Sequence, residues 1–351
     1  MKKYDQLYRE LKKKILSGEY VCGEKLPSKR VTADRSGCSL ITVERAYAML
    51  EDEGYLLSRE RRGYYVCPID ATAIPNTPQQ TVRRLPEPQA SEVAEGASVW
   101  FKAVRKVISE RSDVLFLKAP NRGCAVLRNA IADYLQRCRG MSAQPERIII
   151  GSGSEQLYET VVQILGREKI YGIENPCYEQ IRSVYGGLGV RLCPLRLGSD
   201  GIESAALQGE HFDVLHVTPF HSYPSGVTTS AAKRHEYLKW AQHTGNYIVE
   251  DDFDSEFFRP GHPIESLYAL SGSQSVIYLN TFSKSLSPSM RIGYMILPEA
   301  LEERYEAALG HFSCSVPVLD QYVLAEFIEN GSFERHLNRL RRKMKRNENN
   351  A

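Results

Sequence analysis

Large apolar residues near the amino terminus recur three or four positions apart, which is the spacing of one face of an α-helix. The first run ends before Gly18 and consists of Tyr4, Leu7, Tyr8, Leu11 and Ile15. A later run repeats as i, i+3, i+4 and i+7 and consists of Val43, Ala46, Tyr47 and Leu50. Each pattern predicts a helix that buries one face.

Serine residues mark the expected starts of two helices. Ser28 follows a proline and predicts the N-cap of a short helix, which we expect to end at Gly37 in a left-handed conformation. Ser39 predicts the cap of the next helix, and Leu56–Val66 then predicts two short strands around a charged tip. The expected order is therefore helix, helix, helix, hairpin.

Two helices joined around a glycine, followed by a basic hairpin, form the arrangement that places one helix in the major groove of DNA and a wing on phosphates. The charge distribution agrees with it. Residues 1–68 carry 14 Lys/Arg and 10 Asp/Glu, a net charge of +4, whereas the whole chain has +2, which leaves −2 for the rest. A winged-helix module that binds protein stays open, because the charge excess alone does not exclude it.

The pattern changes after residue 67. Residues 68–96 contain five prolines and few large apolar groups, which favours an extended linker. Beyond it, short apolar runs alternate with helical patterns, which predicts an α/β domain with a mostly parallel sheet over residues 97–351. The expected strands are Ile148–Ile150, Ile170–Ile173, Val214–Val217, Tyr247–Val249, Val276–Leu279 and Ile292–Leu297.

Ligands of such sheets bind at the carboxyl ends of the strands. After the first expected strand, Gly151-Ser152-Gly153-Ser154 leads into a helix, where free amides and the helix dipole can hold phosphate. After the fourth comes the acidic run 250–256. A solvated turn is one interpretation of this run, and the other is a carboxylate that pairs with a cationic ring nitrogen. A calcium loop is excluded, because the required glycine and final glutamate are missing.

The loop after the fifth expected strand holds hydroxyls, Lys284 and Arg291. A Schiff-base lysine, an arginine for phosphate and an upstream aspartate are what pyridoxal 5′-phosphate requires. The three features together favour this cofactor over an ordinary surface lysine.

The amino-terminal segment resembles the winged-helix domain of the GntR superfamily across residues 3–67. The shared motifs are Leu26-Pro27-Ser28-x-Arg30, Ser39-x-x-Thr42-Val43-x-x-Ala46-Tyr47, Glu53-Gly54-Tyr55 and Gly63-x-Tyr65-Val66. The resemblance implies a DNA-binding domain over residues 1–67. It further implies that double-stranded DNA is contacted by Ser28, Arg30, Ser39, Thr42 and Gly63.

One position departs from this family. Its members commonly have Arg directly after the Ser39 position, where this chain has Leu40, and Arg45 is the candidate to compensate. In the wing we expect a charged contact from Arg62.

The remainder resembles fold-type I aminotransferases from about Trp100 to Arg342, and the fusion is similar to MocR-type transcriptional regulators. The motifs include Glu174-Asn175-Pro176-x-Tyr178, Thr218-Pro219-x-His221-x-x-Pro224-Ser225-Gly226, Glu250-Asp251-Asp252-x-Asp254-Ser255-Glu256-Phe257 and Thr281-x-Ser283-Lys284-x-Leu286-x-Pro288-x-x-Arg291-x-Gly293-Tyr294.

The resemblance implies a role for each matching residue. Lys284 would hold the cofactor as a Schiff base, and Asp251 would pair with the ring nitrogen. Tyr178 would stack on the ring. The phosphate would be held by Thr281, Arg291, Ser152, Gly153 and Ser154.

Two departures bear on activity. Phe253 stands where the family usually has a Tyr that hydrogen-bonds the cofactor. The chain stops at Ala351, where the family normally continues into a small carboxy-terminal domain that supplies an arginine for the substrate carboxylate. We therefore expect negligible transamination, and a regulator that senses the cofactor or an amine or amino-acid adduct. An active aminotransferase and a cofactor-free dimerisation platform stay open.

The remaining observations exclude other classes. The 42% apolar and 25% charged residues are typical of a globular protein, and no run is apolar enough to span a membrane. The eight cysteines include no Cys-x-x-Cys pair, so we expect thiols and no metal site. We expect a cytoplasmic protein, and the resemblance implies a homodimer.

Overall fold

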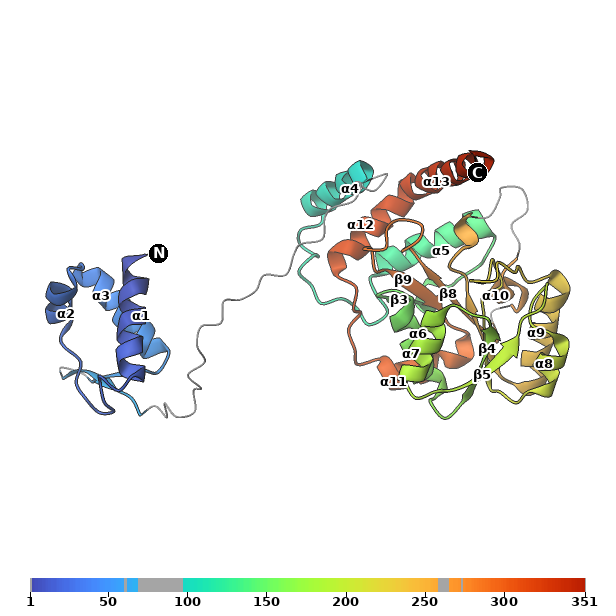
Figure 1. Cartoon of the computed structure of the whole chain (residues 1–351). Coiled ribbons are helices and arrows are strands. Elements are labelled where there is room, and N and C mark those ends of the chain that lie inside the picture. Colours follow the sequence, from blue (N-terminus) through green and yellow to red (C-terminus); the bar gives the residue numbers. More distant parts are fainter. Residues whose placement is uncertain (1, 60–61, 69–96, 258–264, 273, 351) are drawn as a thin grey trace. The chain divides into compact units, whose positions relative to one another are not determined.

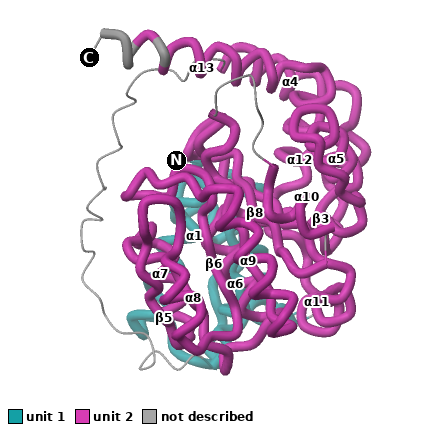
Figure 2. Tube along the Cα trace, turned by 90° about the vertical axis from the view of Figure 1, so that its right-hand side faces the viewer, with its two compact units in different colours: residues 1–89 teal, residues 90–351 magenta. Residues whose placement is uncertain are grey.

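The computed structural model describes residues 2–59, 62–68, 97–257, 265–272 and 274–350. They fall into two units, unit 1 over residues 1–89 and unit 2 over residues 90–351 (Figure 2). The predicted linker, residues 68–96, lies outside the described residues apart from Pro68.

Unit 1 confirms the predicted order of three helices and a hairpin. Its elements are α1 (Lys3–Leu16), α2 (Lys29–Ser36), α3 (Leu40–Asp52), β1 (Leu56–Arg59) and β2 (Gly63–Val66). The two strands pair antiparallel, with Leu56 opposite Val66. The apolar faces of α1 and α3 form one core with Leu26 and the hairpin.

The expected caps begin α2 and α3. The Ser28 hydroxyl accepts a hydrogen bond from the Val31 amide, and the Ser39 hydroxyl accepts one from the Thr42 amide, both at 3.3 Å. Gly37 ends α2 at φ 62°, in the left-handed region that glycine adopts without strain. Local sequence therefore sets both boundaries of the turn between these helices.

Unit 2 alternates strands and helices (Figure 1). Its strands are β3 (Ile148–Gly151), β4 (Ile170–Asn175), β5 (Arg191–Arg196), β6 (Val214–Val217), β7 (Tyr247–Asp251), β8 (Val276–Thr281) and β9 (Gly293–Ile296). Its α-helices are α4 (Ala97–Glu110), α5 (Ala125–Arg139), α6 (Ser154–Leu165), α7 (Glu179–Gly187), α8 (Ser204–Gly209), α9 (Ala231–Thr244), α10 (Leu267–Leu270), α11 (Glu302–Leu309), α12 (Val318–Glu329) and α13 (Ser332–Asn350). Within the described ranges, no helix is long and apolar enough to cross a membrane.

The seven strands form one sheet in the order β3-β9-β8-β7-β6-β4-β5. Neighbours from β8 through β5 pair parallel, whereas β9 runs antiparallel to both β3 and β8. This confirms the mostly parallel sheet. The strand β5 was not predicted, because Arg191, Pro194 and Arg196 interrupt its apolar pattern, as suits an edge strand.

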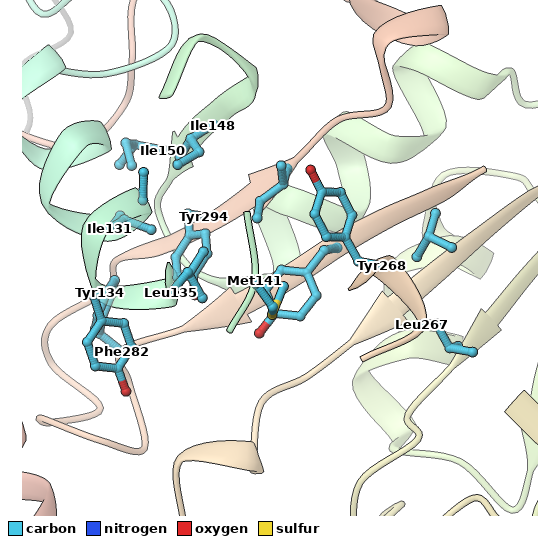
Figure 3. Packing of buried hydrophobic residues seen from close by; sticks show 14 of the residues in the cluster. Ile131, Tyr134, Leu135, Met141, Ile148, Ile150, Leu267, Tyr268, Phe282 and Tyr294 are labelled. Atoms are coloured by element: carbon cyan, nitrogen blue, oxygen red, sulfur yellow. The ribbon is translucent and has the colours of Figure 1, made fainter. Parts of the chain in front are cut away.

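The sheet is buried on both faces. Along β8, Val276 and Tyr278 pack into one apolar cluster with α5, α9 and α12, while Ile277 and Leu279 pack into the other with α6, α7 and α11. This alternation is the period of a strand. Figure 3 shows part of the first cluster, in which α5 contributes Ile131 and Leu135 beside Tyr294 of β9.

The strand directions bring several chain segments to one edge of the sheet. Because β3 and β8 both run antiparallel to β9, they are parallel to each other and end at the same edge. There Gly151 and Thr281 both lie opposite Gly293. The Phe282 amide donates to the Ile292 carbonyl at 2.9 Å, so the loop between β8 and β9 is closed at its base. The expected site residues follow these strand ends.

Candidate functional site

Asp251 ends β7 and is only 3% exposed. Its Oδ2 accepts a hydrogen bond from the Tyr158 hydroxyl, and His216 Nε2 lies 3.7 Å from the same oxygen. The other carboxylate oxygen, Oδ1, is buried and has no hydrogen-bond partner among the described residues. Because a buried acceptor without a partner is costly, this oxygen suits a donor that a ligand would bring.

Two side chains beside Asp251 were not predicted. Tyr158 lies on α6, and burial raises the pKa of its hydroxyl well above the ordinary value, so it stays protonated and donates. His216 shares a 2.8 Å hydrogen bond between its Nδ1 and the Tyr185 hydroxyl. The sequence did carry one signal for it, since a histidine inside an apolar parallel strand is unusual.

The acidic run is not a solvated turn, and that interpretation is wrong. All five of its carboxylates are buried, and each has its own partner: Glu250, Asp251, Asp252, Asp254 and Glu256. Glu250 accepts hydrogen bonds from the Leu267 and Tyr268 amides, at 2.8 and 2.9 Å, and so caps α10. Glu256 accepts one from the Tyr134 hydroxyl.

Asp252 is the centre of a buried ion pair. Arg139 Nη2 lies 2.9 Å from its Oδ2, and the Tyr278 hydroxyl donates to the same oxygen at 2.5 Å. Burial raises the pKa of Asp252, and the Arg139 guanidinium opposes that shift. The pair connects the end of α5 to the turn after β7, so Asp252 has a structural role distinct from that of Asp251.

Lys284 lies in the loop after β8, and its side chain is 42% exposed. Its ammonium forms an ion pair with Asp254 Oδ1, and His221 Nδ1 lies 2.8 Å from Asp254 Oδ2. The rings of Phe253 and Phe257 each lie 5.3 Å from the Lys284 nitrogen. The lysine is therefore oriented by Asp254, whose role the sequence did not suggest.

Arg291 lies against the turn that precedes α6. Gly153 has φ 96°, and a Cβ atom at this position would lie 2.7 Å from Arg291 Nη2. That nitrogen also pairs with Glu155. Burial raises the pKa of Glu155 and Arg291 lowers it, with a net shift downward. Gly153 and the Arg291 guanidinium together form a site for an anion, which we call the cradle. An anion bound there would compete with the Glu155 carboxylate for the guanidinium.

The other predicted phosphate ligands border this cradle. The Ser152 amide already donates to Gln156 Oε1 at 2.6 Å. Ser154 is the first residue of α6. Thr281 ends β8, and its amide donates to Asn280 Oδ1 at 2.6 Å. The structure thus brings Gly153 and Arg291 into contact, with Ser152 and Ser154 on the same turn and Thr281 at the same sheet edge.

Tyr178 precedes α7 and is partly exposed. Its ring lies 6.0 Å from that of Tyr223 in an edge-to-face arrangement. Nearby in the sequence, Glu174 of β4 accepts a 2.6 Å hydrogen bond from Ser222, and burial raises its pKa to about 8. Tyr178 thus contacts another aromatic ring, and Glu174 is a further buried acid, outside the acidic run, to which the sequence assigned no role.

The residues expected to contact DNA lie on the surface of unit 1. Five are exposed and two, Thr42 and Gly63, are half-buried; the exposed ones are Ser28, Arg30, Ser39, Arg45 and Arg62. The Ser39 and Thr42 hydroxyls share a 2.8 Å hydrogen bond. The Arg45 guanidinium stacks on the Tyr4 ring at 4.4 Å.

Three features of the site in unit 2 fit the groups of pyridoxal phosphate. Asp251 offers a buried oxygen without a partner, Lys284 offers an amine, and Arg291 over Gly153 offers an anion cradle. All three lie at or beside strand ends that share one sheet edge. The described residues contain no group of three or more His, Cys, Asp or Glu placed to hold a metal ion.

Comparison with known proteins gives a consistent result. Residues 3–66 match the family described as bacterial regulatory proteins, gntR family, and residues 94–350 match aminotransferase class I and II. An uncharacterized HTH-type transcriptional regulator of Bacillus subtilis, YdeL, is 33% identical over 97% of this chain and 76% of its own length.

Two further relatives carry more specific names. The probable rhizopine catabolism regulatory protein MocR of Rhizobium meliloti is 28% identical over 96% of this chain and 74% of its own length. The HTH-type pyridoxine biosynthesis transcriptional regulator PdxR of Corynebacterium glutamicum is 29% identical over 96% of this chain and 75% of its own length.

Solved aminotransferases share the fold of unit 2. Kynurenine aminotransferase of Pyrococcus horikoshii superimposes with a TM-score of 0.63 at 25% identity, over 70% of this chain and 63% of that one. The α-aminoadipate aminotransferase LysN of Thermus thermophilus, complexed with N-(5′-phosphopyridoxyl)-L-leucine, gives 0.61 at 28% identity, over 70% and 64%. The chain therefore spans less than two thirds of these structures.

Proposed function

The chain belongs to the MocR-type regulators of the GntR family, and from that premise we propose that it binds double-stranded DNA through unit 1 and pyridoxal 5′-phosphate through unit 2. In this proposal the cofactor, alone or with an amine or amino acid, is the signal. The observation that carries it is the unpaired buried oxygen of Asp251 at the same sheet edge as Lys284.

Each residue at this edge has a distinct task. Asp251 would accept the ring N–H, with its other oxygen held by the Tyr158 hydroxyl and near His216 Nε2. Asp254 pairs with the ammonium of Lys284, and this lysine would supply the amine that holds the cofactor. When bound, the cofactor supplies an aldehyde that takes up amines and a ring that withdraws electrons.

The phosphate would occupy the cradle formed by Arg291 and Gly153, with Thr281, Ser152 and Ser154 as further ligands. It would compete there with Glu155 for the guanidinium. Tyr178 would stack on the cofactor ring. Binding would thus rearrange contacts on α6, whose first residues include both Ser154 and Glu155.

Regulation requires that the ligand bind two states of the protein with different affinities. We propose that those states differ in the arrangement of two DNA-binding domains, residues 1–67, in a cytoplasmic homodimer. Residues 68–96 would connect each to an aminotransferase-like domain, residues 97–351. Such a coupling predicts that cofactor or an amine changes the affinity for DNA, and that DNA changes the affinity for the ligand by the same factor.

The decisive test is covalent trapping on the full chain. After incubation with pyridoxal phosphate and reduction with borohydride, mass spectrometry should find a phosphopyridoxyl group on the peptide that contains Lys284. Lys284→Ala should abolish the label, whereas Lys169→Ala, which alters a partly exposed ion pair with Asp213, should retain it. A label at another residue, or none at saturating cofactor, would support the cofactor-free platform instead.

A further inference from the structure

The helix that unit 1 would present to DNA begins with two exposed apolar side chains. Ile41 is 76% exposed and Leu40 is 42% exposed, although they follow the cap of α3 directly. Three other large apolar residues of this helix behave differently, since Val43, Tyr47 and Leu50 are fully buried. The core of unit 1 therefore does not account for Leu40 and Ile41.

The polar side chains of the first two turns of α3 already have partners within unit 1. Ser39 and Thr42 hydrogen-bond each other and cap the helix. Glu44 pairs with Lys29 at 3.4 Å, and Arg45 stacks on Tyr4. Beside these partnered polar groups, Leu40 and Ile41 are exposed at this end of the helix.

Position adds a second argument. In a helix-turn-helix, the amino-terminal residues of the second helix contact base edges, and phosphate contacts set the register. Here the exposed Arg30 is the second residue of α2, two positions after its Ser28 cap, which suits phosphate. The start of α3 is then the segment that faces the bases.

We propose that Leu40 and Ile41 make this protein specific for thymine, by packing against C5-methyl groups in the major groove. The methyl of thymine is the apolar group that the major-groove edges of the base pairs present, so an apolar side chain distinguishes it from the other edges. This inference rests on the proposed binding of DNA by unit 1. At the position after the cap, the family commonly has an arginine, which prefers guanine. Leu40 at that position would prefer thymine instead.

Deoxyuridine provides the test, because it pairs as thymidine does and lacks only the methyl. Binding sites are first selected from random duplexes with the full chain. Each thymine is then replaced singly, and the dissociation constant is measured by fluorescence anisotropy. At one or two positions we expect affinity to fall roughly threefold to tenfold, the effect of losing one or two buried methyl contacts.

Variants assign the contact. Ile41→Ala or Leu40→Ala should bind thymine and deoxyuridine duplexes equally at the affected position. Val21→Ala, which truncates a 59% exposed valine between α1 and α2, should keep the difference. Leu40→Arg should lose the methyl effect and gain a preference for guanine, which arginine contacts at O6 and N7.

Three outcomes would overturn the proposal. Selective binding with no loss at any deoxyuridine position would reject thymine contact and leave the DNA-binding function standing. A loss that persists in the Leu40→Ala, Ile41→Ala double variant would reject these two residues. Failure to select any duplex would reject both the thymine contact and the DNA-binding function.

Discussion

The residues expected to contact DNA and the residues expected to hold the cofactor differ in how deeply they are built into the fold. In unit 1, Arg30 and Arg62 are exposed, and truncating them removes little of the core. In unit 2, the carboxylates of the acidic run at the end of β7, residues 250–256, are buried and have partners on other helices and strands. A substitution at the DNA-contact residues of unit 1 should therefore change function without changing stability, whereas one in the acidic run of unit 2 should change both.

The difference has a physical cause. A winged helix contacts an external polyanion, so its charges must stay in water until the partner arrives. A small-molecule site works by exclusion of water, so its charged groups must be paired or hydrogen-bonded within the protein. Arg139 satisfies that requirement for Oδ2 of Asp252, whereas Oδ1 of both Asp251 and Asp252 is buried without a hydrogen-bond partner among the described residues.

The largest loss of stability should follow from breaking the buried ion pair between Asp252 and Arg139. Asp252→Ala leaves Arg139 and the Tyr278 hydroxyl without their acceptor, and we expect the free energy of unfolding of unit 2 to fall by about 3–5 kcal/mol. Urea denaturation of the full chain measures this loss. Glu110→Ala, at the exposed end of α4, should change it by less than about 0.5 kcal/mol. A loss below about 1 kcal/mol for Asp252→Ala would contradict the comparison.

Substitution of Asp251 should weaken cofactor binding more than substitution of Asp254. Asp251→Asn replaces a charge-assisted hydrogen bond to the ring nitrogen, which corresponds to roughly a tenfold to hundredfold weaker binding. Asp254→Asn retains an oxygen that can accept from Lys284 and should weaken binding less. Titration with pyridoxal phosphate, followed by absorbance, compares the two. Equal losses of affinity would show that Asp251 does not accept the hydrogen bond from the ring nitrogen.

The pH dependence of stability should reveal Glu174. Burial raises the pKa of Glu174 from 4.5 to about 8, so the folded protein keeps a proton that the unfolded chain loses between these values. Its contribution to stability is complete below pH 4.5 and is lost as pH rises to about 8. The associated slope is about −1.4 kcal/mol per pH unit.

Glu174→Gln cannot ionise, so its free energy of unfolding should decline less steeply between about pH 5 and 7.5 than that of the unmodified protein. Glu179→Gln, in which the altered side chain is exposed, should follow the unmodified curve. Parallel curves for Glu174→Gln and the unmodified protein would mean that the buried acid ionises normally.

The smallest change in stability is expected in unit 1. Arg30→Ala and Arg62→Ala should alter the free energy of unfolding by less than about 0.5 kcal/mol. Each should flatten the log-log dependence of DNA affinity on salt by about one unit if it removes a phosphate contact. Arg9→Ala, on the exposed side of α1, is the matched control and should leave the salt slope unchanged. Unchanged affinity and slope for Arg30→Ala and Arg62→Ala would indicate a module that binds protein.

Local features of the fold could be predicted from the sequence, and distant ones could not. The caps at Ser28 and Ser39 follow from residues within four positions, and most strands follow from short apolar runs. The strand β5 was missed because edge strands need no continuous apolar pattern. The antiparallel direction of β9 was missed as well, because direction is set by chain connections and not by composition.

The site shows the same limit. The sequence places Asp251 at a strand end, but its contact with Tyr158 joins residues 93 positions apart. The pair between Lys284 and Asp254 spans 30 positions, and periodicity gives no information at that range. The solvated-turn interpretation failed for this reason, because the partners that make burial of the acids possible lie on other elements.

The closed base of the loop between β8 and β9 has an entropic consequence. The Phe282 and Ile292 backbones are joined there, and both Lys284 and Arg291 lie between them. Folding has therefore already restricted the segment that carries two of the expected ligand contacts. A molecule that spans the amine and the guanidinium need not order a free chain on arrival, which leaves more of its contact energy available as affinity.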